Sequence, residues 1–447
     1  MKSDTFLSIL NFSNFLYVYR CIKKNYKNKK MISRFKSFLN CNLTNLICKM
    51  QSTDFAFKKY NIFLIKEPKY RLIMSEDLDD KIINQVFSRF ILIPYLSNSL
   101  IDSNVATRKN MGANKAYELT EKYLRRLTYE NKEIYALKID ISKYFYNVDH
   151  KLLIEKVSKI IKDERCINFL KKILDTTDLD YINENINKII LEEKERINLL
   201  NISSKEKELK HNELDKLPRY KKGKGLPIGN LSSQILAIFY LNDLDHFIKE
   251  KLRLKCYIRY MDDLLILNTD KEYLKECFKL ISEKINENLL SVNKKSNIYR
   301  CSKGFEFLGY RYFVNNNKIF IKYRRDTMKR IKARLNNLLI NDYKKFVLSK
   351  ASYKGYFMRC GTSVGNKIML SYLFNHSDYN YYKEKYKEKI IIVNNSLFYS
   401  VYCDDAKKIS RYFAKEKFIG NEFFFSNKDF DNVINYIKSI NLDYVVI

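Results

Sequence analysis

The spacing of apolar and polar positions changes along the chain, and each spacing predicts a different kind of element. Short runs rich in β-branched and aromatic residues predict strands; they occur within residues 61–78, at 135–139, at 256–268 and at 305–312. Apolar residues at helical spacing predict helices at 79–94, from 232 onward and at 271–289. Residues 163–222 are charged and lack a motif, which predicts an elaborated surface connection. The pattern indicates a mixed α+β protein.

The two ends of the chain show different patterns. Residues 1–60 alternate apolar and basic patches, which predicts helices with a cationic face that either bind nucleic acid or form a solvated surface. Toward the other end of the chain, residues 323–350 form a basic tract with helical spacing, and residues 386–447 show a strand-helix-strand pattern. Asp404 and Asp405 are expected at the start of that helix, where acids suit the helix dipole, rather than at a second metal site. A chain of 447 residues predicts several packed units.

The hairpin predicted at 256–268 carries two adjacent carboxylates, Asp262 and Asp263, at its turn. Neighbouring acids repel each other unless a cation neutralises them, and Mg²⁺ is commonly bound by one or two carboxylates plus substrate phosphates. A polar turn between two strands is the alternative for this pair taken alone. The hairpin tip is therefore a candidate phosphoryl-transfer site that needs support from other stretches.

A third carboxylate, Asp140, stands at the end of the strand predicted at 135–139. A carboxylate from a second strand is what a two-metal site needs beside the hairpin acids, with the metals about 3.5–4 Å apart. Phe145 lies five residues further along the chain. His150 is interpreted as a residue of a helix start or of the core rather than a metal ligand.

Cations and glycines mark three further stretches. Lys66 and Arg71 flank the turn at 67–69, where they can reach over a bound triphosphate, with Arg giving the bidentate contact. Arg108 precedes the break at Gly112 and suits either a template phosphate or a structural ion pair. The glycines of the loop at 225–229 let the backbone approach a ligand closely.

The composition of the chain indicates the kind of partner that it binds and the compartment that it suits. The chain has 83 Lys and Arg against 51 Asp and Glu, a formal charge of +32, which indicates a polyanionic partner such as nucleic acid. Drift in an AT-rich genome is the alternative, and it explains the residue types better than the imbalance of sign. Nine scattered cysteines without a Cys-x-x-Cys pair, together with only four histidines, argue against a zinc site and against a disulfide framework, and the thiols fit a cytoplasmic protein. No apolar run is long enough to cross a membrane.

The order of these motifs resembles bacterial reverse transcriptases, namely the group II intron, retron, diversity-generating retroelement and defence-associated families. The resemblance covers about residues 60–315. It is carried by YMDD at 260–263, DISKYF at 140–145, GLPIGNLSSQ at 225–234, NKKSNI at 293–298 and FEFLGYRY at 305–312.

The resemblance implies a right-hand polymerase with fingers, a palm of antiparallel sheet plus helices, and a helical thumb, followed by a small C-terminal α/β domain. The expected boundaries are a basic N-terminal extension at 1–60, fingers and palm at 61–320, the thumb-like region at 321–380 and the α/β domain at 386–447.

The resemblance also implies catalytic roles. Asp140, Asp262 and Asp263, together with the Ile141 carbonyl, would bind two Mg²⁺ ions, for which Mn²⁺ is a substitute. One ion would activate the primer 3′-hydroxyl and the other would neutralise the triphosphate. Lys295 would protonate the leaving pyrophosphate.

Substrate contacts follow from the same resemblance. Lys66 and Arg71 would hold the triphosphate, and Phe145 would be the steric gate that excludes a ribose 2′-hydroxyl. The other implied contacts are Ile228, Gly229 and Gln234 beside the incoming nucleotide, and Arg108, Phe307, Leu308, Gly309 and Tyr310 along the nucleic acid.

One departure concerns the loop motif, where most families carry Gln before the glycine and this chain carries Ile228. An apolar residue there resembles the diversity-generating enzymes and some defence-associated enzymes. The change puts fidelity in doubt but leaves polymerisation intact.

The expected function is therefore an RNA-directed DNA polymerase, a nucleotidyltransferase that uses deoxynucleoside triphosphates to copy an RNA template into DNA. The added C-terminal domain favours a role in antiphage defence with a dedicated non-coding RNA. The alternatives are a diversity-generating retroelement enzyme, template-independent or protein-primed synthesis on the same site, and a binding protein that has lost catalysis. The oligomeric state is left open.

Overall fold

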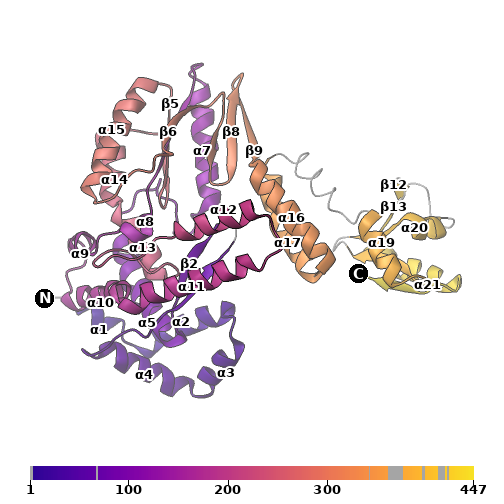
Figure 1. Ribbon diagram of the computed structural model, residues 1–447, viewed down its shortest axis with the longest axis horizontal. Coiled ribbons are helices and arrows are strands. Elements are labelled where there is room, and N and C mark those ends of the chain that lie inside the picture. The colour runs from indigo at the N-terminus through magenta and orange to yellow at the C-terminus, as the bar shows by residue number, and fades with distance from the viewer. Residues whose placement is uncertain are drawn as a thin grey trace. The chain divides into compact units, whose positions relative to one another are not determined.

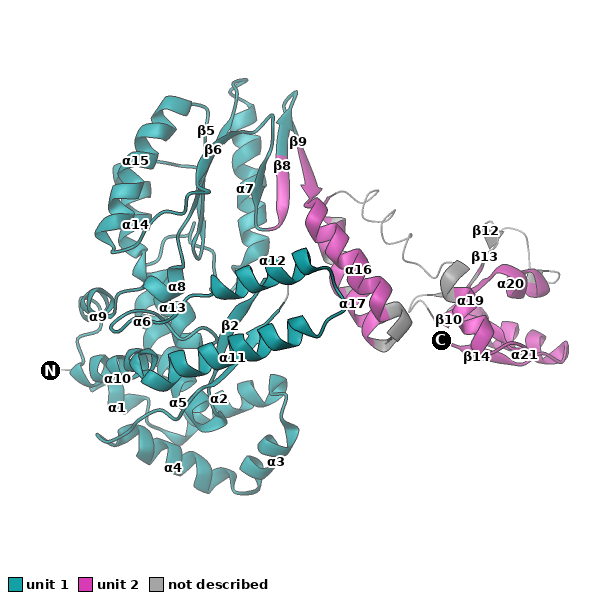
Figure 2. Cartoon of the chain, in the orientation of Figure 1, with its two compact units in different colours: residues 1–308, 313–319 teal, residues 309–312, 320–447 magenta. Residues whose placement is uncertain are grey.

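The structure is a computed structural model, described for residues 4–66, 69–341, 343–360, 376–394, 398–410, 418–419 and 422–447. The chain divides into two compact units (Figure 2). Unit 1 comprises residues 1–308 and 313–319, and unit 2 comprises residues 309–312 and 320–447. Within the described residues, no helix is both long and apolar enough to span a membrane.

A four-stranded antiparallel sheet in the order β4-β5-β3-β6 is the centre of unit 1 (Figure 1). Residues 264–267 of β5 are all buried, although successive side chains of a strand point to opposite faces. Both faces are therefore covered; β3 and β6 contact α15, and β4 and β5 contact α7. The elements are β3 (Tyr135–Asp140), β4 (Tyr257–Tyr260), β5 (Asp263–Asn268), β6 (Asn297–Arg300), α7 (Ala113–Thr128) and α15 (Lys271–Glu287).

Helices that come before and between the strands of this sheet along the chain complete the main core of unit 1. The first 60 residues contribute to this core, because Phe15, Val18 and Leu43 are fully buried in it. The basic residues of these helices remain on the solvent side. The elements are α1 (Thr5–Ser8), α2 (Phe12–Asn25), α3 (Lys29–Ser37), α4 (Leu39–Gln51), α5 (Leu78–Phe87), the π-helix η1 (Ser88–Leu92), α6 (Ile93–Ser97), α8 (Tyr144–Asn147), α9 (His150–Ser158), α10 (Glu164–Asp175), the 3₁₀ helix η2 (Thr176–Asp178), α13 (Leu231–Tyr240), α14 (Asn242–His246) and the π-helix η3 (Phe247–Lys251).

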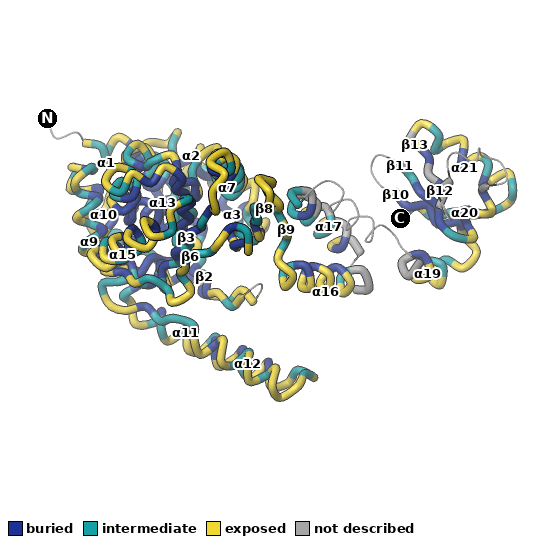
Figure 3. Tube along the Cα trace, turned by 90° about the horizontal axis from the view of Figure 1, so that it is seen from above, coloured by how far each residue is buried: buried dark blue, intermediate teal, exposed yellow. Residues whose placement is uncertain are grey.

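A second core in unit 1 lies under the hairpin of β1 (Asn61–Ile65) and β2 (Arg71–Ser75), which pair antiparallel as predicted. The hairpin packs on the helices α11 (Asp180–Asn198) and α12 (Ser204–Asp215). Ile182, Ile186 and Ile190 recur every four residues on α11 and are buried in this cluster. The far face of the two helices is exposed (Figure 3).

The prediction of a surface connection at 163–222 is therefore wrong in part. Phe169 and Leu170 of α10 belong to the main core, and the isoleucines of α11 belong to the second one. The charged residues of the segment masked its apolar stripe, because an amphipathic helix keeps its polar face in water.

The strand predicted at 305–312 is two strands, β7 (Phe305–Phe307) and β8 (Tyr310–Asn315). Leu308 and Gly309 have φ angles of +45° and +91°, which an extended strand does not allow. With β9 (Lys318–Tyr323), they form a sheet in the order β7-β8-β9, and the boundary between the units falls within it.

Unit 2 contains a helical part and a small sheet. The helices α16 (Arg325–Asn341) and α17 (Tyr343–Met358) share a buried cluster that includes Leu335 and Phe357. The sheet has the order β12-β13-β11-β10-β14. Asp404 and Asp405 lie in the first turn of α20, as predicted. The remaining elements are α19 (His376–Lys385), β10 (Ile390–Asn394), β11 (Phe398–Tyr402), α20 (Cys403–Ser410), β12 (Phe418–Ile419), β13 (Glu422–Ser426), the 3₁₀ helix η5 (Asn427–Asp429), α21 (Phe430–Ser439) and β14 (Tyr444–Val446).

Candidate active site

Strand register brings the three predicted acids together at one end of the central sheet. Asp140, the last residue of β3, lies directly opposite Asp263, the first residue of β5. Tyr260 also pairs with Asp263, so Met261 and Asp262 form the turn of the β4-β5 hairpin. Directly opposed residues on antiparallel strands have Cβ atoms about 4.5–5.5 Å apart. The sheet therefore presents a cluster of three carboxylates.

The cluster is electrostatically unfavourable in the protein alone. Burial, followed by the charge of Asp263, raises the pKa of Asp262 to about 6. Burial and Asp263 also raise the pKa of Asp140. One cation contacts the cluster directly, since Lys138 Nζ lies 3.6 Å from Asp263 Oδ1. Raised carboxylate pKa values indicate a place where a cation would be stabilised.

A buried ion pair supports the hairpin tip. Arg259 and Asp245 are both fully buried, and they form a bidentate pair with Nε–Oδ1 and Nη2–Oδ2 distances of 2.7 and 2.6 Å. Arg259 Nη1 also donates to the carbonyl of Met261 at 3.1 Å. Met261 has a φ of +57°, a left-handed conformation that is costly for a residue with a side chain. The guanidinium thus fixes the strained turn beside Asp262.

The segment at 293–298 forms hydrogen bonds with the backbone of Asp140. The Asn293 N–H donates to the Asp140 carbonyl at 2.7 Å, and the Asp140 N–H donates to Ser296 Oγ at 3.0 Å. Ile141 is buried and forms a β-bridge with Val292. The side chain of Lys295 is exposed, and its charge lowers the pKa of Asp140 against the larger effects of burial and Asp263.

The cations of the β1-β2 hairpin are not equivalent. Lys66 Nζ lies 2.5 Å from Glu193 Oε2 on α11, so this amine is already paired. The charge of Arg71 lowers the pKa of Asp262, and the charge of Lys69 lowers that of Asp140, although burial raises both. The charges of Arg71 and Lys69 therefore both reach the acids, although the sequence predicted only Arg71; the contact of Arg71 with a triphosphate stays a prediction.

The loop after Gly225 packs against β2. The Met74 N–H donates to the Ile228 carbonyl at 2.8 Å. Gly229 has a φ of +130°, and a Cβ there would lie 2.8 Å from the Met74 carbonyl oxygen, so only glycine fits. The Ile228 side chain packs on the second core under the hairpin. Gln234 is half-buried on α13.

Phe145 lies on α8, half-buried, with its ring 5.8 Å from that of Tyr144. Its carbonyl accepts the Leu226 N–H at 2.7 Å, which ties α8 to the glycine loop. His150 is the first residue of α9 and is buried, as predicted. Its Nε2 donates to the Gly225 carbonyl at 2.7 Å.

The residues predicted to follow the nucleic acid differ in accessibility. Arg108 Nη1 donates to the carbonyls of Ile101 and Asn104 at 2.7 and 3.0 Å, so it closes its own loop, and it forms no ion pair with the described residues. The Phe307 side chain is fully buried, and the Leu308 carbonyl accepts from Tyr117 Oη at 2.9 Å. Within unit 2, Gly309 and Tyr310 both contact Tyr356, through a 2.8 Å hydrogen bond to the Gly309 carbonyl and stacked rings 4.8 Å apart.

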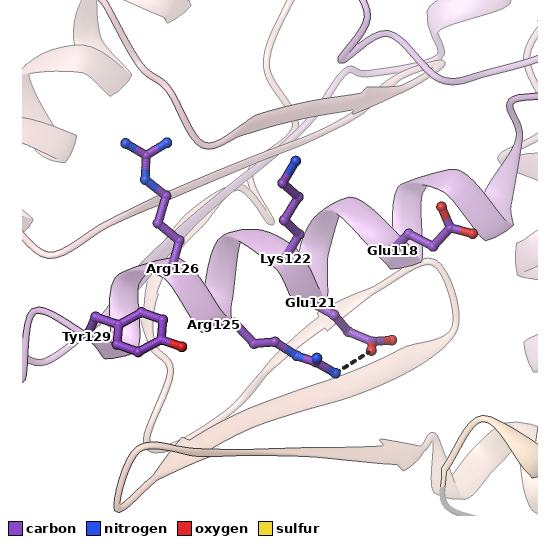
Figure 4. Close-up of a pocket in the computed structure, with 6 residues that line it drawn as sticks. All are labelled: Glu118, Glu121, Lys122, Arg125, Arg126 and Tyr129. Carbon is purple, nitrogen blue, oxygen red and sulfur yellow. Dashed lines mark ion pairs between the residues drawn. The ribbon is translucent and has the colours of Figure 1, made fainter.

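A hollow of about 480 Å³ lies over the second half of α7 (Figure 4). Glu121 and Arg125 form an ion pair there at 3.8 Å. Two acidic and three basic side chains line it, with the acids toward the start of the helix and the bases toward its end, so it presents no single sign of charge. Its described lining contains none of the predicted site residues and consists of Glu118, Glu121, Lys122, Arg125, Arg126 and Tyr129.

Comparison with known proteins identifies the class. The family model described as reverse transcriptase (RNA-dependent DNA polymerase) matches residues 58–312, which is more than half of the 447 residues. The chain belongs to the reverse transcriptase family. No curated protein matches it.

Membership of this family defines the activity at a coarse level. The protein is a nucleotidyltransferase, an RNA-directed DNA polymerase with an RNA template, deoxynucleoside triphosphates as substrates and DNA as product. It has the polymerase fold of fingers, palm and thumb, and the family generally uses a divalent metal. The matched region includes every motif that carries the resemblance, from DISKYF at 140–145 to FEFLGYRY at 305–312.

Proposed function

We propose that this reverse transcriptase makes complementary DNA by two-metal phosphoryl transfer at Asp140, Asp262 and Asp263. The observation that carries the proposal is the register that sets Asp140 opposite Asp263, with Asp262 in the adjoining turn. Carboxylates from two strands at one end of a sheet are the donor set that a pair of divalent ions requires.

The three acids fit Mg²⁺. Their oxygens are hard ligands, and the burial and mutual repulsion that raise the pKa of Asp262 to about 6 would be relieved by a divalent ion. The Ile141 carbonyl is the proposed backbone ligand, and Mn²⁺ is the proposed substitute. When bound, the ions supply activation of the primer 3′-hydroxyl and neutralisation of the triphosphate.

The cations around the acids have separate proposed roles. Arg71 holds the triphosphate, supported by its electrostatic effect on Asp262. Lys66 shares this role once it leaves Glu193, its partner in the free protein. Lys295 gives a proton to the leaving pyrophosphate, supported by its charge acting on Asp140.

The nucleotide sugar and base are proposed to meet Phe145 and the glycine loop. Phe145 is the steric gate against a 2′-hydroxyl, and its carbonyl is fixed by the Leu226 N–H. Ile228, Gly229 and Gln234 lie beside the incoming nucleotide. The close packing of Gly229 on β2 supports this role, because it holds the loop against the hairpin that carries Arg71.

The rest of the chain is proposed to hold the template and product. Residues 61–320 are the fingers and palm, 321–380 the thumb-like region, 1–60 a basic extension and 386–447 an additional small domain. The backbone of Phe307 and Leu308, the segment of Gly309 and Tyr310, and the loop of Arg108 are the proposed nucleic-acid contacts. The net charge of +32 supports a polyanionic partner.

We place the enzyme in bacterial antiphage defence with a dedicated non-coding RNA, and the added C-terminal domain is the support for this assignment. A second candidate, a diversity-generating retroelement enzyme, is favoured by Ile228 before Gly229. An apolar side chain there packs on the second core and offers no amide to the nucleotide.

The test is sequencing of nucleic acid that co-purifies with the wild-type protein and with the Asp262→Ala/Asp263→Ala variant. A defined RNA in both preparations, with complementary DNA only in the wild type, is expected. Adenine-directed errors in that DNA would favour the diversity-generating candidate. DNA without a complementary RNA would contradict templated synthesis.

A further inference from the structure

We propose that His150, Asp175 and Asp178 form a second cation site, separate from the three aspartates, for a divalent transition ion such as Zn²⁺ or Mn²⁺. The site lies on the helices α9, α10 and η2. Its effect on nucleotide binding rests on the function proposed above for the glycine loop, whereas its existence as a metal site does not.

The three side chains come from two segments of the chain, α9 and the continuous stretch of α10 and η2. One ring nitrogen of His150 and one carboxylate oxygen each of Asp175 and Asp178 lie within 4.8 Å of one another. His150 is the first residue of α9, and the two acids end α10 and η2. Asp175 is exposed and Asp178 half-buried, so small side-chain rotations can bring both to bonding distance of one ion.

The hydrogen bond made by His150 prepares its ring for a metal. Its Nε2 contacts the Gly225 carbonyl, which can only accept, so in the neutral ring Nε2 carries the proton and Nδ1 keeps its lone pair. Among the described residues, none forms a hydrogen bond to Nδ1 of this ring, and the side chain is only 6% exposed. Histidine ligands of metals generally donate their other N–H to such a carbonyl.

The donor set decides the kind of ion. One imidazole and two carboxylates suit Zn²⁺ or Mn²⁺ better than thiolate-seeking metals or Mg²⁺, which prefers oxygen ligands alone. Carboxylate oxygens of the two acids also lie within 4.8 Å of each other, so their negative charges repel. A cation between them would remove that repulsion.

The site opens into a hollow of about 490 Å³ that would admit an ion from solvent. Lysines at its rim, Lys151, Lys171 and Lys222, are all exposed. Exposed ammonium groups are screened by water and salt, so their repulsion of a bound cation is weak. The attraction of the cation to the two carboxylates and the imidazole is the larger effect. An anion held by these lysines is the competing outcome of the test.

The same residues form hydrogen bonds to Gly223, which leads into the glycine loop at 225–229. Both carboxylate oxygens of Asp178 accept the backbone N–H of Gly223, at 2.9 and 3.0 Å. The backbone N–H of His150 donates to the Gly223 carbonyl at 3.0 Å. Two residues on, the Gly225 N–H donates to the Val148 carbonyl at 2.8 Å. An ion at this site would therefore fasten the loop that also fixes the Phe145 carbonyl.

The experiment uses the full chain freed of metal with a chelator and then titrated with Zn²⁺ or Mn²⁺ by calorimetry and metal analysis, without nucleotide. The Asp262→Asn/Asp263→Asn variant removes the proposed catalytic site and should still bind one Zn²⁺. Asp175→Asn should weaken that binding by at least about tenfold to a hundredfold, which is the loss caused by changing an outer partner of a ligand. The Asp175 side chain is exposed and forms no hydrogen bond with the described residues, so this variant keeps the fold even where His150→Gln does not.

Equal Zn²⁺ affinity in Asp175→Asn and the parent would overturn the site. Binding of inorganic phosphate that is lost in Lys171→Gln, without Zn²⁺ binding, would replace it with an anion site. In excess Mg²⁺, Zn²⁺ or Mn²⁺ at the site should lower the KM for deoxynucleotide several-fold in the parent and not in Asp175→Asn. Metal binding without that change would overturn the link to the loop, while the proposed polymerase function would be untouched.

Discussion

Arg259 and Asp245 form a fully buried bidentate ion pair, and the same guanidinium holds the carbonyl of Met261. Asp245 receives two further hydrogen bonds, from Tyr257 Oη at 2.7 Å and from Asn104 Nδ2 at 3.2 Å. The hairpin that carries Asp262 and Asp263 is thus anchored by a buried polar network in which both carboxylate oxygens of Asp245 are paired. Such a network costs little while it is complete and much when one member is removed.

Replacing either member of the pair should therefore be strongly destabilising. Arg259→Met and Asp245→Asn should each lower the free energy of unfolding by about 3–5 kcal/mol, because each leaves an unpaired buried group. The double variant should lose less than the sum, and urea denaturation of all three measures this coupling. Additive losses would contradict a direct pair.

The anchor should also matter for catalysis beyond stability. Lys156→Met is a matched control, because Lys156 pairs with Asp243 at 2.7 Å and its described contacts do not include the hairpin. At a temperature where both variants are folded, Arg259→Met should slow nucleotide incorporation more than Lys156→Met does. Equal rates would show that the guanidinium does not position the turn.

The stability of the metal-free protein should fall as pH rises through the titration of Asp262. Its folded pKa of about 6 is above the ordinary value of 3.8, so the folded state binds more protons than the unfolded state between these values. The stabilisation by the protonated form is complete below about pH 4 and is lost as pH rises to about 6.

Melting temperatures of the parent and of Asp262→Asn in chelator, measured between pH 4 and 7, test this titration. The difference in melting temperature between the two proteins separates the effect of Asp262 from that of other buried acids. One such acid is Glu76, because its burial raises its pKa to about 8. Mg²⁺ should reduce the loss in the parent above about pH 6, because it binds the ionised carboxylates. A pH-independent difference would contradict the proposed environment of Asp262.

Gly229 should not tolerate a side chain. Gly229→Ala combines a left-handed φ of +130° with a Cβ 2.8 Å from the Met74 carbonyl oxygen. Gly112→Ala has a similar φ of +104° but open space around its Cβ, so it controls for backbone strain alone. Gly229→Ala should cost about 1–3 kcal/mol more in stability and raise the KM for nucleotide. Identical behaviour would mean that the contact with β2 is not needed.

Phe145→Ala should relax the discrimination against ribonucleotides. Removing the ring opens space where a 2′-hydroxyl is proposed to collide, so relative incorporation of ribonucleotides should rise on the order of tenfold or more. Single-nucleotide incorporation with each triphosphate measures the ratio, and retained use of deoxynucleotides is the internal control. An unchanged ratio would remove Phe145 from this role.

The amino-acid sequence predicts the acids and the elements that carry them, but not how these are joined. Runs rich in β-branched and aromatic residues identify β3 and the hairpin, yet they do not fix cross-strand partners, so the pairing of Asp140 with Asp263 is visible only in the structure. Arg259 was missed because a charged residue in a strand is ordinarily expected to be exposed. Its partner stands 14 residues earlier, on a helix.

Two further differences have local physical causes. The break at Leu308 and Gly309 depends on backbone angles that the apolar pattern of 305–312 does not report. The ion pair of Lys66 with Glu193 depends on the packing of α11 under the β1-β2 hairpin, which a charged segment without a motif did not reveal.

The most direct test of the account is single-nucleotide incorporation on a primed RNA template by Asp140→Asn and Asp263→Asn, each compared with Asp54→Asn, which removes an exposed carboxylate after α4. The account predicts at least about a thousandfold loss in kcat for the two site variants, ~4 kcal/mol of transition-state stabilisation, with the control unchanged. Full activity in either site variant would contradict catalysis by the acids that β3 and β5 bring together.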